Sequence, residues 1–182
     1  MDPGEFIEEF ITKDNKKIKI RAIDSRDVNN IVEFTNKLIE EDAPILLSEK
    51  QDYNSGFSYV YNLINNMAKN KGLSIIAEYN DELIAYADLI KHLGREEHIG
   101  ELGIIISKDF RNKGLGYELM NILIRIAKEQ NCQILTLHVY SHNLAAIRLY
   151  EKLGFRKAGV IPKAAFFNNV GYVDNINMYK SI

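Results

Sequence analysis

The sequence predicts an α/β (α+β) domain with a mixed, mostly antiparallel central sheet flanked by helices. Two hairpin signals support the antiparallel part, because Asp14-Asn15 and Asn80-Asp81 are turn residues that lie between short strand-forming stretches. Helical patterns lie between the first two expected strands and the next three. In the second half, strands alternate with helices, as they do in parallel crossovers.

The individual elements follow from apolar periodicity and from turn and capping residues. Strands are expected at residues 6–12, 17–23, 73–79, 82–92, 97–106, 134–140, 155–161 and 170–180. Helices are expected from the candidate N-caps at 25–27 to about 39, and over about 49–69, 117–130 and 143–153. A break or kink is expected near Ser55 and Gly56 in the second helix, and a loop is expected at 162–169.

The second half is organised around the stretch Arg111-Asn112-Lys113-Gly114-Leu115-Gly116. It follows an apolar run, residues 102–106, and leads into the helical pattern that begins at residue 117. The first turn of a helix has N–H groups without partners and a partial positive charge, and two glycines there leave room for a phosphate. The stretch therefore favours a phosphate or pyrophosphate ligand, although a tight turn or close packing alone would also explain the glycines.

Two known phosphate motifs do not fit this stretch. A Walker loop requires Lys-Ser or Lys-Thr after its second glycine, whereas Gly116 is followed by Tyr117 and Glu118. A Rossmann fingerprint requires a glycine soon after the strand, but residues 107–113 intervene, and Leu119 occupies the position of the third small residue.

Length and composition indicate one domain spanning residues 1–182. The chain is 46% hydrophobic and 26% charged, with a net charge of −2 and a pI of about 6.1. This balance gives no bulk attraction to nucleic acid or to an anionic membrane. The single cysteine, Cys132, cannot form an intrachain disulfide, no apolar segment is long enough to span a bilayer, and residues 1–5 do not resemble a secretion signal. We therefore expect a cytoplasmic protein.

Two motifs resemble those of the Gcn5-related N-acetyltransferase (GNAT) superfamily. Arg111, Gly114 and Gly116 match its coenzyme A signature, Gln/Arg-X-X-Gly-X-Gly/Ala. The stretch from Asn143 to Phe155 matches a second family pattern, Asn-X-X-Ala-X-X-Leu-Tyr-X-X-X-Gly-Phe, at every named position. The order of the expected elements is also similar, so the resemblance covers about residues 17–180.

The resemblance implies an N-acetyltransferase that uses acetyl-CoA as co-substrate, without a metal. In the family fold, two parallel strands splay apart and admit the coenzyme, and the amine attacks the thioester directly in a ternary complex. The residues that the resemblance places at the coenzyme are Ile104, Ile105, Ile106, Arg111, Asn112, Lys113, Gly114, Leu115, Gly116 and Asn143. Asn143 also suits a simple N-cap.

Three side chains are candidates for the chemistry: Tyr150, Glu101 and His138. Tyr150 aligns with the family's tyrosine, and donating a hydrogen bond to the leaving thiolate suits it, because a phenol of pKa about 10 is a weaker acid than a thiol of about 8.5. A core position is the alternative for Tyr150. Glu101 lies where many family members place a base, and His138 stands where the ribosomal-protein alanine acetyltransferases have a glutamate. A surface or paired role is the alternative for each.

The resemblance favours a primary amine of a small molecule, either a polyamine or an amino acid, as the acceptor. Family members with similar C-terminal stretches, including an aromatic pair such as Phe166-Phe167, acetylate these amines or ribosomal-protein N-termini. In the expected loop, the pair would line a pocket or pack underneath it. The acidic loop from Glu40 to Asp42 is either solvated or attracts a cationic substrate. The alternatives are a protein N-terminus or lysine as acceptor, and a non-catalytic coenzyme A-sensing module. A homodimer also fits the family.

Overall fold

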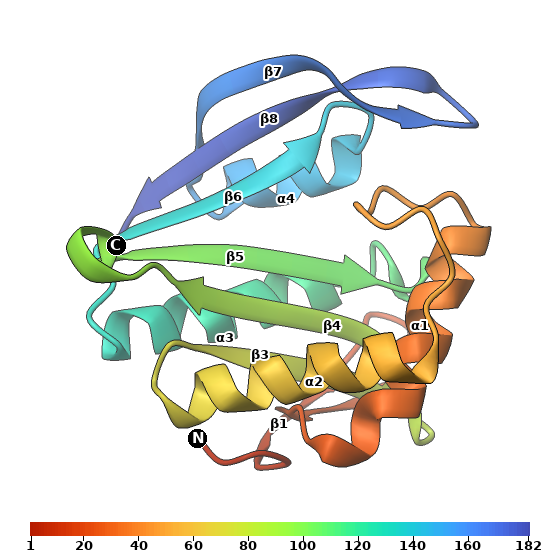
Figure 1. Ribbon diagram of the computed structural model, residues 1–182, viewed down its shortest axis with the longest axis vertical. Coiled ribbons are helices and arrows are strands. Elements are labelled where there is room, and N and C mark those ends of the chain that lie inside the picture. The colour runs from red at the N-terminus through yellow and green to blue at the C-terminus, as the bar shows by residue number, and fades with distance from the viewer.

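The structure is a computed structural model that describes residues 1–182. Its eight strands form one sheet in the order β1-β2-β3-β4-β5-β6-β8-β7, and helices cover both faces (Figure 1). The strands are β1 (Phe6–Ile11), β2 (Lys17–Ala22), β3 (Gly72–Tyr79), β4 (Glu82–Lys91), β5 (Ile99–Ile106), β6 (Ile134–Tyr140), β7 (Arg156–Phe167) and β8 (Gly171–Ser181). The helices are α1 (Val28–Glu40), α2 (Tyr53–Ala68), α3 (Leu115–Glu129) and α4 (Leu144–Lys152).

The predicted fold class is confirmed. All neighbouring strands pair antiparallel except β5 and β6, which are parallel. The two predicted hairpin turns are also confirmed, because Asn15, Asn80 and Asp81 all have positive φ angles. None of the helices combines the length and the apolar character needed to cross a lipid bilayer.

The central strands are covered on both faces. Figure 1 shows α1 and α2 in front of the sheet and α3 and α4 behind it. Consequently the residues of β3 from Gly72 to Ala77 are all buried, whichever face their side chains occupy. Residues from α1, α2, α3 and the central strands belong to the same hydrophobic core.

The predicted break in the second helix is wrong. Helix α2 begins at Tyr53, where the Asp52 side chain accepts a hydrogen bond from the Ser55 N–H at 2.8 Å, and it continues through Gly56 without interruption. A Cβ at residue 56 would lie 2.2 Å from Val32 Cγ2 of α1. Gly56 therefore allows the two helices to pack closely, and this packing outweighs the low helix propensity of glycine.

The loop predicted at 162–169 is also wrong, because β7 continues to Phe167. The strand pairs with β8 on both sides of an irregularity between Ile161 and Ala165, where Lys163 has a φ of 52°. Since β7 is the edge strand, Pro162 does not remove a ladder hydrogen bond with a further strand. Phe166 is exposed, whereas Phe167 is buried against Tyr140, with ring centroids 5.0 Å apart.

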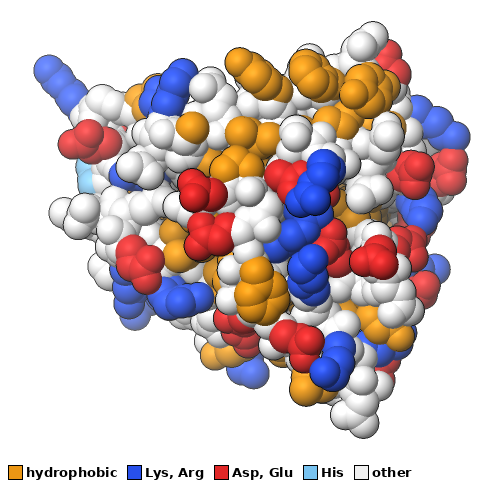
Figure 2. Space-filling model, turned by 90° about the horizontal axis from the view of Figure 1, so that it is seen from below, with side chains coloured by type: hydrophobic (Ala, Val, Ile, Leu, Met, Phe, Trp, Pro, Cys, Tyr) orange, Lys and Arg blue, Asp and Glu red, His pale blue; other side chains and the backbone are white.

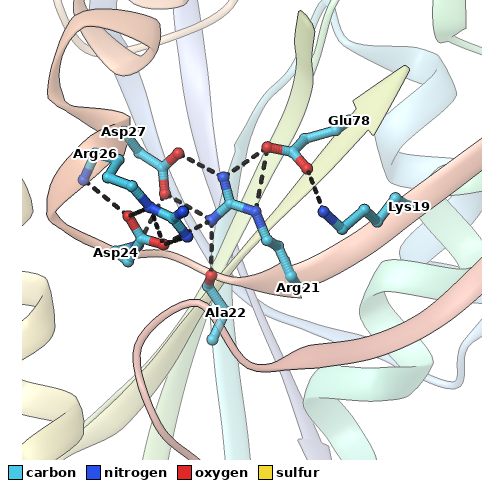
Figure 3. A network of polar contacts seen from close by, with 7 residues as sticks. All are labelled: Lys19, Arg21, Ala22, Asp24, Arg26, Asp27 and Glu78. Carbon is cyan, nitrogen blue, oxygen red and sulfur yellow. Dashed lines mark hydrogen bonds and ion pairs between the residues drawn. The ribbon is translucent and has the colours of Figure 1, made fainter. Parts of the chain in front are cut away.

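A buried ion-pair network fixes the start of α1 to the sheet (Figure 3). Arg21 of β2 donates hydrogen bonds of 2.6 Å to Asp27, just before α1, and to Glu78 of β3. The hydrogen bond with Asp27 raises the pKa of Arg21, and the neighbouring Arg26 lowers the pKa of Asp24. Each carboxylate of this network therefore has an arginine partner.

The charged side chains on one end of the molecule are mixed in sign. Figure 2, seen from below the view of Figure 1, shows basic side chains next to acidic ones and hydrophobic side chains gathered along the upper edge. On the first hairpin, Lys17 lies 3.2 Å from Glu9, and Lys19 lies 3.5 Å from Glu78. This face consequently has no continuous field of one sign.

The sheet opens between β5 and β6. The two strands pair only from Ile99–Glu101 with Ile134–Thr136, and β6 then pairs with β8 alone along the rest of its length. Figure 1 shows β5 and β6 diverging from this point. Beyond Glu101, β5 therefore has an unpaired edge in the middle of the sheet.

Candidate active site

A cleft of about 270 Å³ lies on the α3 and α4 side of the β5–β6 gap. It is lined by Ile104, Ile106, Arg111, Asn112, Gly114, Gly116, Tyr117, Asn143, Ala145, Ala146, Leu149 and Tyr150. Most of the residues predicted at the coenzyme are in this set. Three are not. Ile105 lines a second cleft on the opposite face of the sheet, described below, and Lys113 and Leu115 line neither of the two clefts.

The N-terminus of α3 has free backbone donors, and of the residues that carry them Gly116 lines this cleft. Gly114 is the N-cap with a φ of 94°, and no side chain caps the helix. The Tyr117 and Glu118 N–H groups bond to the Gly114 carbonyl, whereas the Leu115 and Gly116 N–H groups have no acceptor in the protein. Together with the helix dipole, these donors suit an anion such as a phosphate.

Gly116 keeps the space in front of these donors open. A Cβ at residue 116 would lie 3.1 Å from Leu149 Cδ2 of α4 and 3.2 Å from Ile106 Cδ1 of β5. Any side chain there would fill the narrow part of the cleft between α4 and β5. The residues present therefore fit a ligand that runs from the start of α3 along the edge of β5.

The two cations of the predicted loop have different surroundings. The Lys113 Nζ lies 2.6 Å from Asp14 Oδ2 at the tip of the first hairpin, and this contact lowers the pKa of Asp14 to about 2. Arg111 lines the cleft, and its Nε donates to the Ile106 carbonyl at 2.8 Å. Arg111 is thus placed to face a ligand, while Lys113 anchors the loop to the hairpin.

The carboxylates of the acidic loop after α1 all contact partners within the protein. Glu40 lies 2.6 Å from Lys50, and Glu41 lies 3.7 Å from Arg111. Asp42 accepts a hydrogen bond from the Asn169 N–H at 3.0 Å. These contacts account for the three carboxylates without a bound cationic ligand. The next residues, 44–46, line a second cleft that is described below.

The unpaired edge of β5 carries backbone N–H donors. At one end of β5, the Ile99 carbonyl accepts a hydrogen bond from the His92 N–H. At the other end, the Ser107 N–H donates to the Ile84 carbonyl, and the β4–β5 register has no shift between these two bonds. Because antiparallel pairs alternate, the odd-numbered residues of β5 bond to β4. The N–H groups of Ile104 and Ile106 therefore point into the gap left by β6.

A second cleft, of about 360 Å³, lies on the opposite face of the sheet. It is lined by Pro44, Ile45, Leu46, Tyr59, Asp88, Ile90, Glu101, Leu102, Gly103, Ile104, Ile105, His138, Val139, Tyr140, Asn143 and Tyr150. Ile104, Asn143 and Tyr150 line both clefts. The two clefts therefore meet at the β5–β6 gap.

Glu101 and His138, predicted as separate base candidates, lie together in the second cleft. His138 Nδ1 is 3.3 Å from Glu101 Oε1. This contact lowers the pKa of Glu101 and raises the pKa of His138. His92 also approaches Glu101, with its Nε2 at 3.9 Å from Oε2. The pair is a carboxylate–imidazole unit at the vertex of the gap.

Tyr150 was expected either at the site or in the core. It is buried and also lines both clefts, so both descriptions apply to it. Burial is the cause that raises the pKa of its hydroxyl to about 12. Its ring packs edge-on against Phe155, with centroids 6.1 Å apart. Asn143 likewise combines two positions, because its Oδ1 accepts the Ala146 N–H at 3.2 Å as an N-cap while the residue lines both clefts.

Asp88 of β4 lines the second cleft but was not predicted from the sequence. Its Oδ1 occupies the side-chain space of Gly103 on β5, since a Cβ at residue 103 would lie 2.3 Å from that oxygen. Burial raises the pKa of Asp88 from its ordinary value of 3.8 to about 6. Next to it, the hydroxyls of Tyr59 and Tyr86 lie 3.1 Å apart. The signal that could have identified it is its position as the one acidic residue in the interior of β4, among apolar neighbours.

The aromatic pair Phe166-Phe167 does not line the second cleft. Phe167 packs on His142, with ring centroids 4.7 Å apart, and Phe166 packs edge-on against Tyr172 at 5.2 Å. Of the two predicted arrangements, packing beneath the surface describes Phe167, and Phe166 remains exposed.

Comparison with known proteins agrees with this geometry. The sequence profile of the acetyltransferase (GNAT) family matches residues 35–155. The provisionally named phosphinothricin acetyltransferase YwnH of Bacillus subtilis is 23% identical over 161 residues, which cover 84% of this chain and 93% of that protein. A GNAT-family acetyltransferase structure from Streptococcus pneumoniae is 24% identical with a TM-score of 0.80, covering 91% of this chain and 99% of that one. The provisionally assigned acetyltransferase yncA of Salmonella typhimurium, solved with acetyl-CoA, is 22% identical with a TM-score of 0.76, covering 90% and 93%.

Proposed function

Because this chain belongs to the acetyltransferase (GNAT) family, we propose that it transfers the acetyl group of acetyl-CoA to a primary amine in a ternary complex. The observation that carries this proposal is the meeting of two clefts at the β5–β6 gap, where both are lined by Ile104, Asn143 and Tyr150. One cleft suits a long phosphate-bearing ligand and the other opens on the opposite face. Two substrates bound in them would meet at the gap without a covalent enzyme intermediate.

The α3 side of the sheet is the proposed coenzyme site. The free N–H group of Gly116 would bind the pyrophosphate, with Arg111 adding positive charge. The N–H groups of Ile104 and Ile106 and the Asn143 side chain would bind the amides of the pantetheine arm. The acetyl-CoA-bound yncA structure supports this assignment through its similar fold.

The chemistry requires that the amine nitrogen form a bond to the acetyl carbonyl carbon while the carbon–sulfur bond breaks. A backbone N–H of β5 would stabilise the negative charge that develops on the carbonyl oxygen. Tyr150 would donate a hydrogen bond to the departing thiolate. With a tyrosine pKa of about 12 and a thiol pKa of about 8.5, complete proton transfer from Tyr150 would be uphill by about 5 kcal/mol. Hydrogen-bond donation is therefore the proposed role of Tyr150.

The attacking amine must lose a proton, and the Glu101–His138 pair is the proposed acceptor. A neutral imidazole accepts a proton, and the adjacent carboxylate stabilises the imidazolium that results. The pair lies at the vertex of the gap, on the face opposite the coenzyme cleft. An amine entering from the second cleft would therefore reach the pair and the thioester together.

The proposed acceptor is the primary amine of a small molecule, a polyamine or an amino acid. The relative YwnH, provisionally named for acetylation of phosphinothricin, supports a small-molecule acceptor. The volume of the second cleft, about 360 Å³, suits an acceptor of that size. A peptide N-terminus is the second acceptor class to test.

The experiment is thiol release from acetyl-CoA by the purified protein with polyamines, amino acids and short peptides, together with calorimetric binding of acetyl-CoA. We expect saturable binding and amine-dependent thiol release with at least one small-molecule amine. Turnover only with peptides would replace the acceptor class. Binding without turnover on any amine would contradict the enzymatic function and favour a coenzyme-sensing module, and no binding would contradict the site itself.

A further inference from the structure

The second cleft is lined by acidic side chains and a histidine but by no strongly basic side chain. Apart from the weakly acidic tyrosine hydroxyls, its ionisable side chains are Asp88, Glu101 and His138. The lining contains no lysine or arginine. Binding a carboxylate in such a cleft would require it to lose water without gaining a cationic partner. An ammonium group, by contrast, would gain two partners of opposite charge.

Asp88 is the carboxylate of this cleft that has no cation beside it. Glu101 has His138 at 3.3 Å, and the buried carboxylate Asp27 elsewhere in the protein has Arg21 at 2.6 Å. Burial is the largest cause that raises the pKa of Asp88, and the neutral Tyr86 hydroxyl lowers it as a hydrogen-bond partner, but no basic group acts on it. A partly buried carboxylate without a cationic partner is costly for the folded protein, and a bound cation would offset that cost.

Gly103 holds the Asp88 carboxylate in a defined place. Since the carboxylate occupies the side-chain space of Gly103, it lies over β5 in the second cleft. Asp88 pairs with Gly103, and Glu101 pairs with Ile90, so the two carboxylates are diagonal neighbours on adjacent strands. Diagonal neighbours have Cβ atoms about 7 Å apart.

On the basis of the proposed function, we propose that the acceptor is a di- or polyamine without a carboxylate. One amine reacts beside the Glu101–His138 pair while a second, protonated amine binds Asp88. A short diamine such as 1,4-diaminobutane spans a distance of the order of the diagonal between the two carboxylates. The second ammonium remains chemically unchanged in the reaction and fixes the position of the reacting amine.

This inference selects between the acceptor classes of the proposed function. An amino acid carries a carboxylate next to its amine, and the second cleft offers that group no lysine or arginine. A simple alkylamine fits the cleft but leaves Asp88 without a cationic partner. The predicted order of specificity is therefore diamine, then monoamine, then amino carboxylate.

The test compares three acceptors of matched length: 1,4-diaminobutane, butylamine and 4-aminobutanoate. Each is assayed by amine-dependent thiol release with the wild-type protein, with Asp88→Asn, and with the control Asp81→Asn, which makes the same chemical change in the β3–β4 turn. Calorimetric binding of 1,4-diaminobutane to the protein with coenzyme A gives a second measurement that does not depend on turnover.

For the wild-type protein we expect kcat/KM for 1,4-diaminobutane to exceed that for butylamine by at least about tenfold, with 4-aminobutanoate weakest. Asp88→Asn should reduce the diamine-to-monoamine ratio to within about threefold, and Asp81→Asn should not change it. Diamine binding measured by calorimetry should weaken in parallel.

Two results would overturn this inference: 4-aminobutanoate used as well as butylamine, or a diamine preference that survives Asp88→Asn. If no amine is acetylated, the proposed function fails, and calorimetry then decides the inference by itself. Diamine binding that depends on Asp88 would support it, and absence of diamine binding to the wild-type protein would overturn it.

Discussion

His138 Nδ1 lies 3.3 Å from Glu101 Oε1, across the point where β5 and β6 separate. The two residues come from different strands, and Glu101 is in the last residue pair that β5 makes with β6. The contact therefore spans the vertex of the gap and places a carboxylate–imidazole unit in the second cleft.

The first prediction concerns the pKa of His138. Its contact with Glu101 raises that pKa, so Glu101→Gln should lower it. The contribution of the raised His138 pKa to stability should be complete below the pKa of an unfolded histidine while Glu101 stays ionised, and it should disappear as the pH rises through the folded-state pKa of His138. Titration of the His138 ring by NMR measures the change.

Glu96→Gln is the matched control for this titration, because Glu96 contacts His92 at 2.9 Å and not His138. The control should leave the His138 titration where it is. An equal shift in both variants, or none in Glu101→Gln, would contradict the proposed coupling between Glu101 and His138.

The second prediction is that Tyr150→Phe lowers kcat by at least about 100-fold. The substitution removes the proposed donor to the thiolate but retains the ring that packs against Phe155. The thermal unfolding midpoint should therefore change little. Tyr79→Phe is the control, since Tyr79 packs on Phe110 and lines neither cleft. A Tyr150→Phe enzyme with wild-type kcat would exclude the hydroxyl from the chemistry.

The third prediction is that Gly116→Ala weakens acetyl-CoA binding by at least about tenfold. The added methyl group would lie 3.1 Å from Leu149 Cδ2 and would narrow the cleft in front of the free N–H groups. Calorimetry measures the affinity. Gly159→Ala is the matched control, because nothing lies within 4 Å of a Cβ there. Unchanged affinity in Gly116→Ala would move the coenzyme away from the start of α3.

The fourth prediction is that Asp88→Asn stabilises the ligand-free protein at neutral pH. Because folding raises the pKa of Asp88 from 3.8 to about 6, the folded protein binds the proton more tightly, and stability falls as the pH rises through this window. Above it, the free energy of unfolding of the variant should be higher by at most about 3 kcal/mol, and below it the two proteins should be equal.

Denaturant unfolding at several pH values measures this difference, with Asp81→Asn as the control. A destabilising effect of Asp88→Asn at neutral pH would mean that the carboxylate has a stabilising partner within the protein. It would also remove the reason to expect a cationic ligand there.

The sequence identified the parts of the site that are local in the chain. The stretch from Arg111 to Gly116 leads into the start of α3, and the stretch from Asn143 to Phe155 contains the whole of α4, so a linear motif determines their geometry. The family, which these motifs indicated, is confirmed. The mostly antiparallel sheet, which the hairpin turns indicated, is also confirmed. The assigned roles of Tyr150, Glu101 and His138 stay predictions.

Features that depend on distant contacts could not be predicted in this way. Gly56 indicated a helix break, but its contact with Val32 of α1 makes it a packing residue. The position of Asp88 depends on the space left by Gly103 across a strand pair, and no linear pattern records that pairing. The direction of Lys113 toward Asp14 likewise depends on where the first hairpin lies in the fold.

The central claim is that coenzyme and amine meet through the β5–β6 gap. The most direct measurement is calorimetric binding of a bisubstrate conjugate, in which the sulfur of coenzyme A is joined to 1,4-diaminobutane through an acetyl bridge. If the two clefts meet at Ile104, Asn143 and Tyr150, the conjugate should bind at least about 100-fold more tightly than coenzyme A alone. Equal affinities for the conjugate and for coenzyme A would contradict the claim.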